Sequence, residues 1–174
     1  MEQTQPLSYG QERLWFLHRF DPRDHSYNTC HAYRLHGELD LPALEAAFAA
    51  VVRRHETLRT RFDEIDGRPV AVVLPAGPVT IDRCEAGSEE EARRIVAERA
   101  NAPFDLSAAP PVRVSLIRLG AQEHVLAVTL HHIIADGASV VVLRDELAHH
   151  YAGRDPLPPL ALQYGEHVRE QRAR

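Results

Sequence analysis

Cysteine, methionine and tryptophan are scarce in this sequence, which contains two, one and one of them among 174 residues. Cys30 and Cys84 lie far apart and form neither a CxxC pair nor a spacing typical of zinc ligands. We therefore expect two free thiols, as in a cytoplasmic protein, rather than a disulfide framework.

Long apolar runs and an excess of positive charge are also missing. The longest apolar stretch surrounds Val125–Leu130 and is far shorter than the roughly 20 residues of a membrane-spanning helix. Met1–Pro6 shows no basic region followed by an apolar one, so no secretory signal is indicated. Lys and Arg number 20 against 25 Asp and Glu, a net charge of −5 without a basic stripe. We expect no membrane and no nucleic acid as partners, and a cytoplasmic location.

The remaining composition is that of one ordinary domain. Hydrophobic residues make up 44% of the chain and charged residues 26%, which is enough apolar material for a packed core. Capping signals and apolar spacing predict helices over 8–17, 40–52, 88–101, 137–151 and 163–174. Alternating patterns predict strands over 27–36, 58–62, 69–74, 80–82, 112–119 and 124–130, with a hairpin turn at Asp66-Gly67. This order favours an α/β (α+β) sandwich, a mixed β-sheet covered by helices.

The segment from His131 to Gly137 holds the clearest candidate site. An apolar strand runs directly into His131 and His132, and neighbouring residues of a strand point to opposite faces. One imidazole should therefore face a cavity while the other packs behind it. Asp136 could orient an imidazole, cap a helix or pair with an arginine, and Gly137 allows a backbone approach that a β-carbon would obstruct.

These residue types suit proton transfer without a covalent intermediate. A histidine, with an ordinary pKa near 6.5, can accept a proton from an amine or hydroxyl around neutral pH. No serine or cysteine occupies a nucleophile-elbow sequence, so direct attack of one bound substrate on another is the indicated chemistry. Two alternatives stay open: a purely structural His-His-Asp cluster, and a metal site, which is disfavoured because adjacent imidazoles diverge on a strand. We expect no metal.

Three segments, in chain order, resemble motifs of the condensation domains of nonribosomal peptide synthetases, which belong to the chloramphenicol acetyltransferase-like superfamily. They are Leu7–Leu17, with Gly10 where alanine is usual, Arg54–Phe62, and Leu130–Ser139 with its HHxxxDG pattern. Pro156–Leu160, followed by Gln163-Tyr164, resembles the stretch that precedes the second lobe of the family. The resemblance covers nearly all of the chain.

The resemblance implies a role for each motif residue. His132, the second histidine, would be catalytic, and His131 and Asp136 would be structural. Asp136 would pair with an arginine of the second segment, for which we choose Arg59, predicted to lie in mid-strand where an unpaired charge would be costly. Arg61 is the second choice. Gly137 would line the substrate path, and Ala138, where a bulky residue is common, would reshape it.

The same resemblance implies an incomplete enzyme. Complete condensation domains form a tunnel between two lobes, where an acceptor amine attacks a donor thioester. Both substrates are carried on phosphopantetheine arms of carrier proteins, so the chain itself would bind no cofactor. Residues 1–174 correspond to the N-terminal lobe, with 153–174 as the connection and the start of the inter-lobe helix, and the C-terminal lobe is absent from this sequence.

The resemblance also implies several partners and one alternative function for a chain that supplies only one side of the tunnel. The expected partners are peptidyl or acyl carrier proteins, a second lobe or neighbouring synthetase domains, and, through self-association, another copy of this chain. The alternative is a catalytically inactive half-domain that serves as a carrier-protein or domain-interaction module. We expect the isolated chain to be inactive, or nearly so, in amide formation.

Overall fold

The computed structural model describes residues 2–173 and contains two β-sheets. The larger sheet has the strand order β2-β7-β6-β5, with β2 (Asn28–His36), β7 (Glu123–His131), β6 (Val112–Gly120) and β5 (Ile81–Glu85). The smaller sheet has the order β1-β4-β3, with β1 (Gln3–Pro6), β4 (Arg68–Val73) and β3 (Thr60–Ile65). The mixed α/β fold is confirmed, because β5 runs parallel to β6 while the other pairs are antiparallel.

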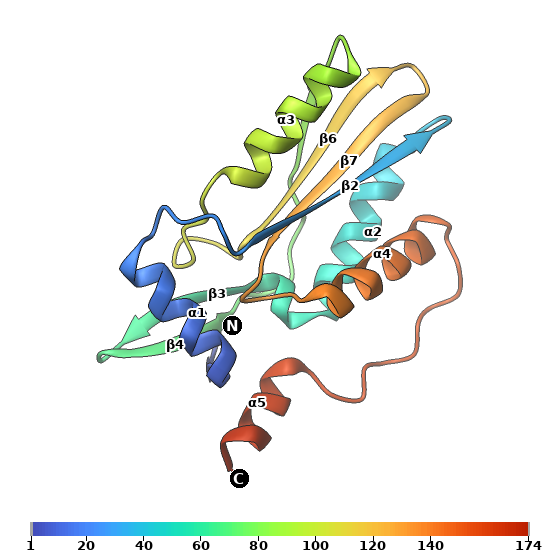
Figure 1. The fold of residues 1–174 in the computed structure, drawn as a ribbon. Coiled ribbons are helices and arrows are strands. Elements are labelled where there is room, and N and C mark those ends of the chain that lie inside the picture. The colour runs from blue at the N-terminus through green and yellow to red at the C-terminus, as the bar shows by residue number, and fades with distance from the viewer. Residues whose placement is uncertain (1, 174) are drawn as a thin grey trace.

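Helices cover both faces of the larger sheet (Figure 1). Helix α3 (Glu89–Asn101) lies on one face, where Ala92 packs with Ile117 of β6. Helices α2 (Leu41–Arg54) and α4 (Gly137–Tyr151) lie on the other face and share the main core with Leu126, Val128 and Leu130 of β7. Strand β7 is thus buried on both sides, which explains why its sequence is a nearly continuous apolar run.

Local sequence signals account for most of the element boundaries. Helix α1 (Tyr9–Phe20) begins at the predicted capping box, in which Ser8 and Gln11 exchange side-chain and backbone hydrogen bonds. Asp40 caps α2, and the buried residues of this helix follow the helical spacing: Leu44, Ala47, Phe48, Val51 and Val52. Asp66 (φ 51°) and Gly67 (φ 74°) form the turn between β3 and β4, where both residues adopt the left-handed conformation of a tight hairpin.

Two features differ from the prediction. Arg59 does not lie in a strand, because Glu56–Arg59 forms a 3₁₀ helix and β3 begins at Thr60. Strand β1 was not predicted, since four residues of largely polar sequence ending in proline give no alternation to detect.

The C-terminal segment returns to the N-terminal elements. Residues 152–163 cross the surface to α5 (Tyr164–Ala173), which lies beside the N-terminal strand and α1 (Figure 1). Nε of Arg172 donates to the carbonyl of Leu7 (2.6 Å), and the hydroxyl of Tyr164 donates to Oγ of Ser8 (3.0 Å). The predicted helix at 163–174 is confirmed, although Arg174 lies outside the described residues. Among residues 2–173, no helix is long and apolar enough to cross a bilayer.

Gly165 allows α5 to approach β1, which gives a test of this packing. A β-carbon at Gly165 would lie 1.5 Å from Oε1 of the buried Gln5, beside a cavity of only about 20 Å³. We expect Gly165→Ala to lower the free energy of unfolding by about 1–3 kcal/mol, because the added methyl group would displace the buried Gln5 amide where little free space adjoins it. Denaturant unfolding monitored by circular dichroism measures this loss.

Gly10→Ala is the matched control, because Gly10 is likewise the second residue of its helix. A β-carbon there would meet nothing closer than Oγ of Ser8 at 3.9 Å, so the substitution should be neutral or stabilise by roughly 0.5–1 kcal/mol. Equal effects of the two substitutions would contradict the packing argument.

Candidate active site

The two adjacent histidines diverge at the end of β7, as strand geometry predicts. His131 is 3% exposed, whereas His132 is exposed at the surface. The backbone N–H of His132 donates to the carbonyl of Tyr27 (2.8 Å) just before the start of β2, which holds the end of β7 against its neighbour. The chain therefore presents one accessible imidazole and buries the other.

His131 is held neutral inside the protein. Burial lowers its pKa to about 4, with smaller contributions from His18 and His132. Its Nδ1 accepts a hydrogen bond from the backbone N–H of Ile133 (3.0 Å), so the ring carries its proton on Nε2. His131 thus shapes the loop that follows β7 and is not available for proton transfer to solvent-exposed groups.

His132 borders a cavity of about 420 Å³. The loop from His132 to Asp136 and Ser139 of α4 form part of its lining. The 160–167 segment supplies another part, including Tyr164 and His167, and His55 and Thr57 complete the polar lining. Residues far apart in the sequence therefore surround one accessible imidazole.

Asp136 serves as the N-cap of α4. Its Oδ1 accepts from the backbone N–H of Ser139 (2.8 Å) and from its hydroxyl (2.7 Å), and these bonds lower the pKa of the carboxyl. The carboxylate is exposed, so its charge needs no buried partner. Of the roles left open for Asp136, capping a helix is the one the structure contains.

The predicted ion pair between Asp136 and Arg59 is wrong. Nη1 of Arg59 donates to the carbonyl of Leu74 (2.5 Å), and its Nη2 lies 3.6 Å from Oε1 of Glu56. The second choice, Arg61, pairs with Asp63 (2.6 Å). Within residues 2–173, neither arginine forms an ion pair with Asp136, because both are directed toward the other partners named above.

Gly137 is the first residue of α4 and lies at the surface next to the cavity. A β-carbon at this position would meet nothing within 4 Å, and its backbone is not in the left-handed region. The interpretation that a β-carbon would be obstructed is therefore wrong for the atoms of this chain. That Gly137 lines a substrate path stays a prediction.

Comparison with known proteins assigns the family. The model of the condensation domain family matches residues 1–174. The chain belongs to the condensation-domain family. It is 42% identical over 182 residues to a linear gramicidin synthase of Brevibacillus parabrevis, covering 98% of this chain and 2% of that protein. Tyrocidine synthase 3 of the same organism is 40% identical over 159 residues, which cover 91% of this chain and 2% of the synthase.

Solved structures agree with this assignment. The X-domain of teicoplanin biosynthesis, in complex with OxyB, matches with a TM-score of 0.89 and 39% identity over 98% of this chain and 38% of that one. The first condensation domain of the calcium-dependent antibiotic synthetase matches with a TM-score of 0.84 and 25% identity, over 98% and 43% of the two chains. This condensation-domain chain thus spans less than half the length of the solved chains that it matches.

His55, which lines the His132 cavity, forms a contact that the sequence did not predict. Nε2 of His55 lies 2.6 Å from Oε2 of Glu146, whose other oxygen accepts from Nε of Arg54 (3.0 Å). This cluster joins the end of α2 to the middle of α4. His55 belongs to the second motif of the condensation domain, but nothing in the sequence indicates that its partner lies 91 residues away.

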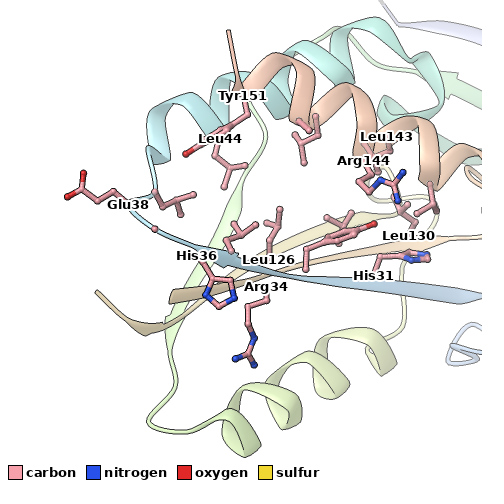
Figure 2. Close-up of a pocket in the computed structure, with 18 residues that line it drawn as sticks. His31, Arg34, His36, Glu38, Leu44, Leu126, Leu130, Leu143, Arg144 and Tyr151 are labelled. Carbon is pink, nitrogen blue, oxygen red and sulfur yellow. The ribbon is translucent and has the colours of Figure 1, made fainter. Parts of the chain in front are cut away.

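A second cavity, of about 470 Å³, does not include His132. Figure 2 shows it between the larger sheet and the two helices, with Leu126 and Leu130 on the strand side and Leu44 and Leu143 on the helix side. The lining of this cavity is mainly apolar, and charged residues such as Arg144 lie at its border. Of these two cavities, only the smaller one is lined by the motif residues His132 and Asp136. Among residues 2–173, no group of three or more His, Cys, Asp or Glu could hold a metal ion.

The buried neutral state of His131 predicts a pH dependence of stability. Its pKa is about 4 in the folded state against an ordinary value of 6.5, so the unfolded state binds the proton first. Stability from this group is present above pH 6.5 and is lost as the pH falls toward 4, by up to roughly 3 kcal/mol. Urea unfolding at intervals between pH 7 and 4 measures this slope.

His131→Asn is the control for that slope. Asparagine can still accept from the N–H of Ile133 but does not titrate, so the free energy of unfolding should depend less steeply on pH than in the original chain. Identical slopes in the two proteins would show that His131 is not the group responsible.

Asp136 gives a second prediction, which separates capping from ion pairing. Asp136→Ala should lower the free energy of unfolding by about 1 kcal/mol, because α4 loses its N-cap. Asp136→Asn should retain nearly all of the stability, since an amide oxygen caps equally well. Thermal unfolding at neutral pH compares the two, and an Asn variant as unstable as the Ala variant would favour a role for the charge.

Proposed function

We propose that this chain is the N-terminal lobe of a condensation domain and that His132 takes part in amide formation between two carrier-bound substrates. The observation that supports this most directly is the placement of His132. It is the accessible member of the histidine pair, at the end of a buried strand and on a 420 Å³ cavity. Two relatives, named as a linear gramicidin synthase and tyrocidine synthase 3, match the chain at 42% and 40% identity.

The proposed reaction joins an amine to a thioester. The amine nitrogen of the acceptor attacks the thioester carbonyl of the donor, a C–N bond forms, and the C–S bond breaks. The proton leaves the amine for Nε2 or Nδ1 of His132 and ends on the released thiolate of the donor's phosphopantetheine arm. His131 stays neutral and holds the loop, and Asp136 holds the first turn of α4, so neither exchanges a proton in this scheme.

The lobe supplies one side of the reaction site. His132 is exposed, and the cavity beside it is open to solvent, whereas transfer to an amine rather than to water needs a site from which water is excluded. We propose that a second lobe supplies the opposite wall, and that carrier-protein domains and neighbouring synthetase domains are the partners of the complete domain.

A second candidate function is a binding module without catalysis. The observation that favours it is the match to the teicoplanin X-domain, whose structure was solved in complex with OxyB. This chain keeps the residues of the HHxxxDG motif as His131, His132, Asp136 and Gly137, and the accessible imidazole argues for the catalytic alternative.

The test restores a second lobe and then removes the imidazole. We expect the 174-residue chain alone to form little or no dipeptide from aminoacyl and peptidyl carrier proteins, because one wall is missing. A fusion to a second condensation lobe should form amide, and His132→Ala should lower its kcat on the order of 10²-fold or more. Product formation is followed by mass spectrometry of the carrier-bound peptide.

His36→Ala is the matched control, since His36 is an exposed histidine at the far end of β2. It should leave the rate unchanged. Robust turnover by the monomeric 174-residue chain would overturn the claim that amide formation needs a second lobe. An unchanged rate for His132→Ala in the fusion would overturn the catalytic role and favour the binding module.

A further inference from the structure

Gln11 is a buried polar residue on the core-facing side of α1. It is 6% exposed and lies beside Leu14 and Trp15, which pack into the core. A buried amide needs partners for its donors and acceptors. Its Oε1 accepts from the backbone N–H of Ser8 (3.0 Å), and its Nε2 donates to the carbonyl of Ile133 (3.1 Å).

These two partners fix the orientation of the amide. The N–H of Ser8 can only donate and the carbonyl of Ile133 can only accept, so a flipped amide would place like groups against each other. Capping of α1 and contact with the His132 loop are therefore made by one side chain in one orientation. The second bond joins residues 122 positions apart in the sequence.

The loop that carries His132 begins immediately after β7, where the backbone groups no longer pair with neighbouring strands of the sheet. His132 itself is held through its N–H by Tyr27, and the N–H of Ile133 is held by His131. The carbonyl of Ile133 receives its bond from Gln11. Hydrogen bonds to backbone groups thus hold the chain on both sides of the His132 side chain, and Gln11 supplies one of them from α1.

Helix α5 joins the same set of hydrogen bonds through Ser8. Oγ of Ser8 accepts from the N–H of Gln11 (3.2 Å) and from the hydroxyl of Tyr164 (3.0 Å). Tyr164 also lines the His132 cavity. A shift of α5 would therefore change both a wall of the cavity and the hydrogen bond to Ser8, which is the partner of Gln11.

We propose that Gln11 is a positioning residue for His132 and that the Tyr164 hydroxyl, through Ser8, makes this positioning depend on the docking of α5. The proposal rests on the proposed function of His132. Gln11 acts through the carbonyl of Ile133 and does not touch the reacting atoms.

Two substitutions test the proposal with little change in shape. Gln11→Glu keeps an oxygen for the N–H of Ser8 but replaces the donor to Ile133 with a second oxygen, which can donate only when the carboxyl is protonated. Tyr164→Phe removes one hydroxyl from a side chain that is 41% exposed. Ser88→Ala is the matched control, because it removes the N-cap of α3, on the face of the sheet away from α4.

The first readout is the NMR signal of the His132 ring in the 174-residue chain, assigned by its disappearance in His132→Gln. We expect Gln11→Glu to shift this signal clearly and Tyr164→Phe to shift it less. Ser88→Ala should lower the melting temperature by an amount comparable with these two variants but leave the His132 signal in place. Lowering the pH should return the signal of Gln11→Glu toward that of the unsubstituted chain measured at the same pH, as the carboxyl gains its proton.

The second readout is the rate of amide formation in the fusion with a second lobe. Gln11→Glu should lower kcat on the order of 10- to 100-fold with KM nearly unchanged, because a displaced group affects the transition state more than binding. Tyr164→Phe should lower kcat less, and Ser88→Ala should leave it unchanged.

Each outcome bears on one claim. If Gln11→Glu and Tyr164→Phe leave the His132 signal where Ser88→Ala leaves it, Gln11 is a structural residue only and the proposal is overturned. If the signal shifts as expected but the unsubstituted fusion forms no amide, the proposed function fails while the positioning of His132 by Gln11 stands.

Discussion

The burial of β7 between two layers is the constraint on which the site depends. Strand β7 pairs with β2 on one side and β6 on the other, α3 covers one face, and α2 and α4 cover the other. A strand in this position cannot slip by one residue without exchanging its core side chains for those of the opposite face. The alternation that places Leu130 in the core therefore also directs His131 to the opposite face of the sheet, where it is buried. His132 follows in the turn after β7, where its side chain is exposed.

A second constraint follows where β7 ends. The loop is buried at Ile133, Ile134 and Ala135, so its backbone groups need partners that the sheet no longer provides. His131 supplies one through its ring, which works as an acceptor because burial keeps it neutral. Gln11 supplies another from α1, and Asp136 then begins α4 by capping it. The loop is thus ordered by polar contacts, which have direction, whereas apolar packing alone tolerates rotation and sliding.

Local signals in the sequence predicted the parts of the fold that depend on neighbours along the chain. The Ser8–Gln11 capping box and the divergence of the histidine pair need only propensity and the period of a strand. Features that depend on distant partners had no such signal. Arg59 turned to Leu74 and Glu56 instead of Asp136, because a 3₁₀ helix replaced the expected strand and changed the direction of its side chain. The bond from Gln11 to Ile133 likewise depends on which segments meet in space. The sequence therefore predicted the bond between Gln11 and Ser8 but not the bond between Gln11 and Ile133.

The two cavities show why volume alone does not locate chemistry. The larger one, between the sheet and the helices, has a mainly apolar lining, and the groups at its border that carry charge include Arg34, which is paired with Glu89 and Glu123. Histidines line both cavities, but the motif residues His132 and Asp136 line only the smaller one, together with residues from three separate parts of the chain. Catalysis needs groups that can change protonation next to the reacting atoms, and it needs those groups held in place. If His132 acts as proposed, this chain holds it in place with its own residues. The cavity is open to solvent, and an imidazole open to solvent would assist water and amine alike. Under the proposed function, selective amide formation therefore depends on a second surface that excludes water from this cavity.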